Sequence, residues 1–153
     1  MMGSRGRRRW TSASAEPPEP TAMGRDEPVP VQLNHTIVHA TNKRRSARFL
    51  ADMLGLAEPT EYGPFLVVQT ANGVSLDFID DASGFQPQHY AFLVTEDEFD
   101  QIFERIKARG VAYWADPLHQ RPDLINTNDG GRGLYWADPD GHNLEIITRP
   151  YGG

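Results

Sequence analysis

The sequence of 153 residues contains no cysteine. A disulfide framework, a thiolate zinc site and a catalytic cysteine are therefore excluded. No apolar run approaches the roughly 20 residues that a membrane-spanning helix needs, so we expect no membrane partner. The lack of cysteine also suits a reducing compartment, and we expect a cytoplasmic protein.

Positive charge is scarce as well. Lys and Arg total 15 against 21 Asp and Glu, which gives a formal net charge of -6. The first 32 residues carry +1, from five Arg and four acidic residues, so the rest of the chain carries -7. Because phosphate contacts need clustered Lys and Arg, we expect no nucleic-acid partner.

Periodic apolar pattern is missing from the first 31 residues, which contain five prolines. Such a segment cannot bury enough surface to offset the entropy lost on ordering, so we expect a disordered tail over residues 1–31. A single domain is expected over residues 32–150, followed by a short tail at 151–153.

From residue 33 onward the chain contains two copies of one unit. In each copy a strand is followed by a helix, which a capping residue opens and a glycine closes, and then by further strands. The expected strands and helices lie at 33–40, 43–54, 65–70 and 74–79 in the first copy, and at 89–94, 95–110, 111–115, 133–137 and 142–148 in the second. The predicted fold class is α+β, with two tandem β-α-β-β-β modules at about 33–80 and 88–149.

Metal-ligating side chain types occupy equivalent positions in the two copies. His35 matches His89, and Asp77 matches Glu145. The span from histidine to acid is 42 residues in the first copy and 56 in the second, the extra residues falling in a polar stretch around 116–131. A lone strand histidine is usually structural, and an isolated strand acid is usually solvated. Four such residues at repeat-equivalent positions instead favour a metal site, because two imidazoles with one or two carboxylates suit a divalent transition metal.

The other histidines are weaker candidates. His39 shares a strand face with His35 and is a candidate to replace it as a ligand. His119, in the long polar loop, and His142, after a turn, are interpreted as structural.

The turn before the last strand has the sequence Pro-Asp-Gly, and its length determines which residue lies opposite Glu145. A three-residue loop closed by a left-handed glycine pairs Tyr135 with Glu145 on the same sheet face. A two-residue loop would place Leu134 opposite Glu145 instead.

Three segments, 33–37, 89–94 and 133–146, resemble the vicinal oxygen chelate superfamily. That superfamily includes glyoxalase I, extradiol dioxygenases, fosfomycin-resistance thiol transferases and bleomycin-binding proteins. The resemblance spans about 33–150 and implies that paired modules curl their sheets into a cup around a metal ion. It also implies a homodimer, since paired chains are common in this family.

The same resemblance assigns roles to residues. His35, His89 and Glu145 fall on the metal ligands, and the ion implied is Fe, Ni, Zn, Co or Mn. Asp77 falls on a fourth ligand position that is usually glutamate in glyoxalases; being one methylene shorter, it is expected to act through water or as a base. Tyr135 falls near the metal glutamate, as in dioxygenases and thiol transferases; the alternative is a rim aromatic.

The function that these residues favour is a glyoxalase-like isomerase, lyase or epimerase acting on a small oxygenated substrate chelated by the metal. Asp77, Glu145 and Tyr135 are its candidate catalytic residues, since two carboxylates are available for proton transfer. An Fe(II) extradiol dioxygenase ranks lower, because Ser75 stands where that class is expected to place an extra histidine.

Two further alternatives remain. A fosfomycin-type thiol transferase would need a phosphonate site, for which Arg132 is the main candidate. A non-catalytic drug-binding resistance protein is disfavoured, because the bleomycin binders lack the metal ligands that His35, His89 and Glu145 represent.

Overall fold

The computed structural model describes residues 31–151. The predicted disorder of the N-terminal tail falls outside this range, apart from Val31. The chain from Gln32 onward is one compact unit. Within the described range no helix is long and apolar enough to cross a membrane, while the cytoplasmic location stays a prediction.

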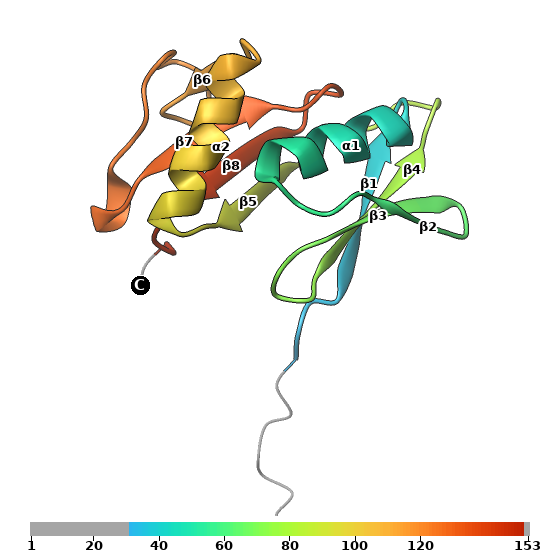
Figure 1. Cartoon of the computed structure of the whole chain (residues 1–153). Helices are drawn as coiled ribbons and strands as arrows, with labels where there is room; N and C mark the ends of the chain where they lie inside the picture. Colours follow the sequence, from blue (N-terminus) through green and yellow to red (C-terminus); the bar gives the residue numbers. More distant parts are fainter. Residues whose placement is uncertain (1–30, 152–153) are drawn as a thin grey trace, which may run out of the picture. The chain divides into compact units, whose positions relative to one another are not determined.

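The first module consists of one helix and one four-stranded sheet (Figure 1). Its elements are β1 (His35–Ala40), α1 (Lys43–Leu54), β2 (Thr60–Tyr62), β3 (Phe65–Gln69) and β4 (Ser75–Asp80). The strand order is β1-β4-β3-β2, with β1 parallel to β4 and the other pairs antiparallel.

The second module repeats this arrangement with a longer connection before its last two strands. Its elements are β5 (His89–Leu93), α2 (Glu96–Ala108), β6 (Tyr113–Trp114), the short 3-10 helix η1 (Asn128–Gly130), β7 (Gly133–Ala137) and β8 (Asn143–Ile147). The order β5-β8-β7-β6 again has one parallel pair, β5 with β8. The predicted α+β class and internal duplication are confirmed, and the strands form two separate mixed sheets.

The helix boundaries follow from local chemistry. The Asn42 side chain accepts the Arg45 N–H at the start of α1, and Gly55 ends the helix at a φ of 71°. At the start of α2, Thr95 and Glu98 form the predicted capping box. β2 was not predicted, because its three residues are all exposed and show no apolar alternation.

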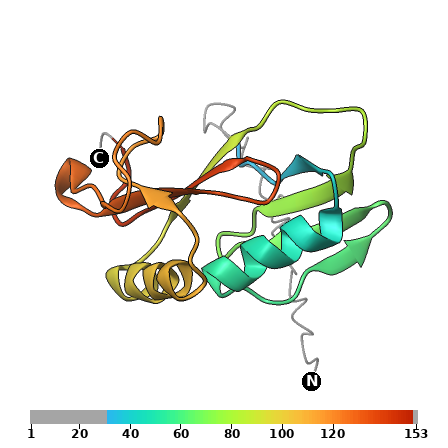
Figure 2. The ribbon, with the colours of Figure 1, turned by 90° about the horizontal axis from the view of Figure 1, so that it is seen from above.

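Each helix lies against one face of its own sheet (Figure 2). In β4, the buried residues Leu76 and Phe78 face α1, whereas the alternating residues between them are only half-buried. Apolar residues of both helices and both sheets form one core cluster. Burying the helix-covered faces leaves the other face of each sheet for polar side chains.

Two side chains of the second module bind the backbone and helix of the first. Asp140 accepts hydrogen bonds from the Thr41 N–H (3.2 Å), the Thr41 hydroxyl and the Ser46 hydroxyl (2.6 Å) at the start of α1. His142 is buried, donates from Nε2 to the His39 carbonyl (2.8 Å) and accepts the Gln88 N–H at Nδ1 (2.9 Å). The structural interpretation of His142 is therefore confirmed, with its ring joining the modules.

Candidate metal centre

The hairpin between β7 and β8 sets the register of the site. Asp138 N–H bonds to the His142 carbonyl, and Gly141 has a φ of 86°. Tyr135 consequently lies opposite Glu145, as the three-residue loop predicted.

His89 and Glu145 lie together on the open face of the second sheet. His89 pairs with Asn143 across the parallel strands, so Glu145 is two residues further along β8. His89 Nε2 is 3.2 Å from Glu145 Oε2. The Glu145 residue is fully buried, while 45 % of the His89 side chain is exposed.

The hydrogen bonds of His89 limit what can occupy this site. Its Nδ1 is 2.9 Å from the Asn143 carbonyl oxygen, which can only accept, so Nδ1 carries a proton. Nε2 then faces a carboxylate oxygen. A neutral ring and a carboxylate would set two acceptors against each other, and a cation between nitrogen and oxygen relieves this opposition. Holding one ring nitrogen on a carbonyl while the other faces outward is typical of metal-ligating histidines, so the residues fit a divalent ion.

Two tyrosines complete the surroundings of Glu145. The Tyr151 hydroxyl donates to Glu145 Oε1 at 2.6 Å. Because that hydroxyl has one proton, its oxygen accepts from the Tyr135 hydroxyl, 2.9 Å away. Burial, assisted by the Glu145 carboxylate, raises the pKa of both tyrosines, so both keep their protons at neutral pH.

Tyr151 was missed by the sequence analysis, which placed it in a terminal tail. Its position depends on contacts between distant residues. Thr148 and Arg132 exchange two hydrogen bonds just after β8, and the Arg149 side chain packs against Gly131. No periodic pattern signals such contacts.

An aromatic wall continues from the site along the same face. Tyr135 stacks on His89, with ring centroids 5.9 Å apart, and Trp114 lies opposite Tyr135 in β6. His119 stacks on Trp114 at 3.8 Å and bonds through Nε2 to Asn143 Oδ1 at 3.0 Å. His119 thus has the structural role that was predicted, holding the long loop against the sheet.

The backbone conformation of the long loop after β6 is held by contacts within the loop. Three non-glycine residues adopt left-handed backbone conformations, His119, Asp123 and Asp129. The Asp116 carboxylate accepts hydrogen bonds from the backbone N–H groups of residues 118, 120 and 121. Side-chain contacts, rather than backbone preference, therefore fix the loop beside the site.

The first module carries the matching residues in a different setting. His35 is exposed on β1, with Nδ1 bonded to Asn34 Oδ1 at 2.8 Å, so its Nε2 is available. Asp77 accepts from the Ser75 hydroxyl at 2.8 Å. Among residues 31–151 no three His, Asp or Glu side chains are grouped closely enough to hold a metal ion. The structure therefore brings Glu145 together with His89 and Tyr135, but not with His35 or Asp77.

Two other candidates have structural partners. His39, the substitute ligand, bonds to Asp81 at 2.8 Å. Arg132 binds Glu96 and Asp100, each at 2.6 Å, and lies over the Phe99 ring. The guanidinium of Arg132 is thus already neutralised on α2, which weakens it as a phosphonate ligand.

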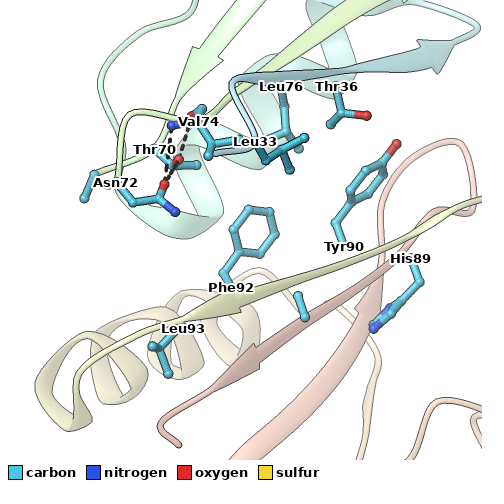
Figure 3. Close-up of a pocket in the computed structure, with 12 residues that line it drawn as sticks. Leu33, Thr36, Thr70, Asn72, Val74, Leu76, His89, Tyr90, Phe92 and Leu93 are labelled. Carbon is cyan, nitrogen blue, oxygen red and sulfur yellow. Dashed lines mark hydrogen bonds between the residues drawn. The ribbon is translucent and has the colours of Figure 1, made fainter. Parts of the chain in front are cut away.

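A mainly apolar cavity of about 460 Å³ lies along β5, and every residue of this strand, His89 included, contributes to its lining. Figure 3 shows Tyr90 and Phe92 pointing into it toward Leu33 and Leu76, while His89 points away to the other side of the strand. The cavity therefore borders the strand that carries His89, while the His89 ring itself is directed toward Glu145.

Comparison with known families gives a match over most of the described chain. A sequence model of the Glyoxalase/Bleomycin resistance protein/Dioxygenase superfamily matches residues 32–146. The glutathione transferase FosA of Serratia marcescens is 29 % identical over 121 residues, covering 74 % of this chain and 78 % of that protein. The metallothiol transferase FosB of Lysinibacillus sphaericus (strain C3-41) is 23 % identical, covering 76 % and 81 %.

Two solved structures give higher identity. The structure titled oxidase ChaP-H1 is 67 % identical, with a TM-score of 0.80, and the match covers 81 % of this chain and all of that one. The oxidase ChaP-H2 is 64 % identical, with a TM-score of 0.78, covering 80 % and 97 %. A fosfomycin resistance protein, FosX, from Listeria monocytogenes shares the fold at 22 % identity, with a TM-score of 0.61, covering 79 % and 95 %.

Proposed function

Since the chain belongs to the glyoxalase/bleomycin resistance protein/dioxygenase superfamily, as its sequence resemblance indicated, we propose that it is a metal-dependent enzyme that oxidises a small organic substrate. The observation that carries metal binding is His89, whose two ring nitrogens both face oxygen acceptors. Oxidation is favoured over transfer because identity to the two oxidases is 64 % and 67 %, against 23 % and 29 % for the two transferases.

His89 and Glu145 are the protein ligands that the second module offers. When bound, a divalent ion would supply Lewis acidity and, if it is iron, redox chemistry. The Tyr135 and Tyr151 hydroxyls hold protons beside the carboxylate. Trp114 and Tyr135 place two aromatic side chains beside the carboxylate on the same sheet face.

His35 is proposed as the third ligand, supplied by a second copy of the chain. It stands on the edge strand β1, and, as in His89, its Nδ1 bonds to an oxygen acceptor, so that Nε2 is left for a metal ion. Exposed apolar side chains lie on or next to the edge strands β1 and β5, namely Leu33, Ile37 and Leu93. Covering them with a second copy would bury apolar surface and bring two modules from different chains together.

The isomerase, lyase or epimerase prediction remains as a second candidate. Asp77 favours it, because this carboxylate occupies the position in the first sheet that Glu145 occupies in the second. In the proposed dimer Asp77 would approach the site from the opposite chain and act as a base, which matches the role expected for the shorter side chain.

Oxygen consumption separates these functions. Protein loaded with Fe(II) would be offered catechols and hydroquinones under air, thiol hemiacetals without oxygen, and fosfomycin with thiols. We expect oxygen uptake with a phenolic substrate and none in Glu145→Gln. Product formation only in the anaerobic thiol hemiacetal assay would replace the proposal with the second candidate.

Asp77→Asn sharpens the choice. An oxidase that takes its ligands from His35, His89 and Glu145 keeps its metal and its oxygen uptake in this variant. A proton-transfer enzyme keeps its metal but loses about 10²–10⁴-fold in kcat, the usual contribution of a general base.

A further inference from the structure

We propose that Tyr151 is a positioning residue, which fixes the Glu145 carboxylate so that one oxygen is engaged and the other is presented to the metal beside His89. The inference rests on the proposed metal site, and it assigns a role to a residue at the very end of the described chain.

The two oxygens of Glu145 have different partners. Oε1 accepts the short bond from the Tyr151 hydroxyl, and Oε2 faces His89 Nε2. A carboxylate held in this way offers one oxygen to an ion on the His89 side. Without the tyrosine hydroxyl, both oxygens would be available, and the carboxylate could bind through two oxygens or rotate.

Tyr151 differs from the other members of this network in its exposure. Glu145 is fully buried and Tyr135 is nearly so, whereas 59 % of Tyr151 is exposed. A hydroxyl that reaches a buried carboxylate from an exposed residue is not there to fill the core. Its contribution is the hydrogen bond itself. The Tyr135 hydroxyl in turn donates to the Tyr151 oxygen and so orients the Tyr151 proton toward Glu145.

The segment after β8 brings the Tyr151 side chain back over Glu145. After β8 ends, Thr148 is bonded to Arg132, and the backbone bends at Thr148 and Arg149. Gly131 permits this course, because a Cβ there would lie 2.6 Å from Arg149 Cγ and 2.9 Å from Thr148 Oγ1. Gly131→Ala should therefore displace the terminal segment without altering any member of the network.

The test uses the full-length protein in two states. In metal-free protein carrying ¹³C at the glutamate side-chain carboxyl, the Glu145 resonance is identified by its loss in Glu145→Gln. We expect Tyr151→Phe and Gly131→Ala to shift this resonance. Tyr62→Phe, which alters an exposed tyrosine on β2, should leave it unchanged.

In the second state the same proteins are titrated with Co²⁺. We expect Tyr151→Phe to lower Co²⁺ affinity about 10- to 100-fold, the usual effect of removing a partner that orients a ligand. The visible spectrum of bound Co²⁺ should also change, because the carboxylate coordinates differently. A merely structural tyrosine would alter neither quantity.

The outcomes separate the two proposals. If wild-type protein binds no Co²⁺, the metal-dependent function fails, and the carboxyl resonance still decides whether Tyr151 holds Glu145. If Tyr151→Phe matches Tyr62→Phe in resonance, affinity and spectrum, the positioning role of Tyr151 is wrong while the metal site stands.

Discussion

The two modules share one topology and one register, yet they treat the same pair of side chains differently. In each, a histidine on the first strand lies two residues diagonally from an acid on the last strand. In the second module Glu145 is buried and contacts His89, whereas in the first Asp77 is half-buried and bonds to Ser75.

The difference comes from what has been added around the acid. The second module has 14 more residues between histidine and acid, and these form the loop that holds the aromatic wall in place. It also has Tyr151 above Glu145. The first module lacks both and leaves His35 exposed. Duplication thus gives two similar sheets, of which one encloses a carboxylate and the other presents an imidazole.

The largest expected effect tests whether both modules supply a ligand. We expect His89→Ala and His35→Ala each to lower metal affinity more than about 100-fold, beyond what the loss of an orienting partner costs. The melting temperature of the metal-free protein should hardly change, since neither imidazole is part of the core. Metal titration by calorimetry is the measurement.

His39→Ala is the matched control, because it removes an imidazole of the same strand that bonds to Asp81, and metal affinity should not change. Equal metal affinity in wild type and His35→Ala would remove the first module from the site and leave His89 and Glu145 as its protein ligands.

The next test asks whether the two modules of one site come from different chains. Refolding an equal mixture of His35→Ala and His89→Ala should restore about a quarter of the wild-type metal content, since half the dimers are mixed and each has one intact site. Neither variant refolded alone should bind metal. No recovery in the mixture, with dimers present by light scattering, would place the whole site within one chain.

A third prediction concerns the turns before β4 and β8, which are equivalent but act differently. Asp140 binds α1 of the other module, whereas its counterpart Asn72 bonds within its own turn, to Thr70 and Val74. Asp140→Ala should lower the free energy of unfolding by about 2–4 kcal/mol, because it leaves the buried Ser46 hydroxyl without its acceptor. Asn72→Ala should cost less than about 1 kcal/mol.

The pH dependence of stability checks the same contact. Burial of Asp140 opposes ionisation, but the hydrogen bonds from Ser46 and Thr41 outweigh it and lower the pKa below 3.8. The contribution of Asp140 is therefore complete above pH 3.8 and is lost as the pH falls through the lower folded-state value. Urea denaturation of wild type and Asp140→Asn over pH 2–6 should show a smaller acid loss in the variant.

The smallest expected effects concern the helix caps. Asn42→Ala in the first module and Thr95→Ala in the second should each cost about 1 kcal/mol. Because one core cluster includes both helices, both variants should show a single unfolding transition. Two transitions, each shifted by only one of the variants, would mean that the modules unfold separately.

Much of the fold follows from local signals in the sequence. The cap at Asn42, the capping box at Thr95 and the turn at Gly141 fix element ends, and the register that places Tyr135 opposite Glu145 follows from that turn. These features depend on neighbouring residues, so they can be predicted without a structure.

The rest depends on contacts between residues far apart in the chain. The position of Tyr151 requires Arg149 to pack against Gly131, and the joining role of His142 requires the His39 carbonyl. Repeat equivalence predicted that His35 and His89 are alike, but not how far apart the two sheets hold them. Only packing between elements sets such distances.

The left-handed residues of the loop after β6 have a consequence for how such proteins diversify. His119 and Asp123 hold costly backbone conformations only because contacts within the loop and with the sheet edge impose them. The strands that carry His89 and Glu145 do not depend on that conformation for their own pairing. Exchange of this loop between relatives would therefore alter the wall that meets a substrate while the ligand-bearing strands are inherited unchanged, so new specificities can arise without rebuilding the metal centre.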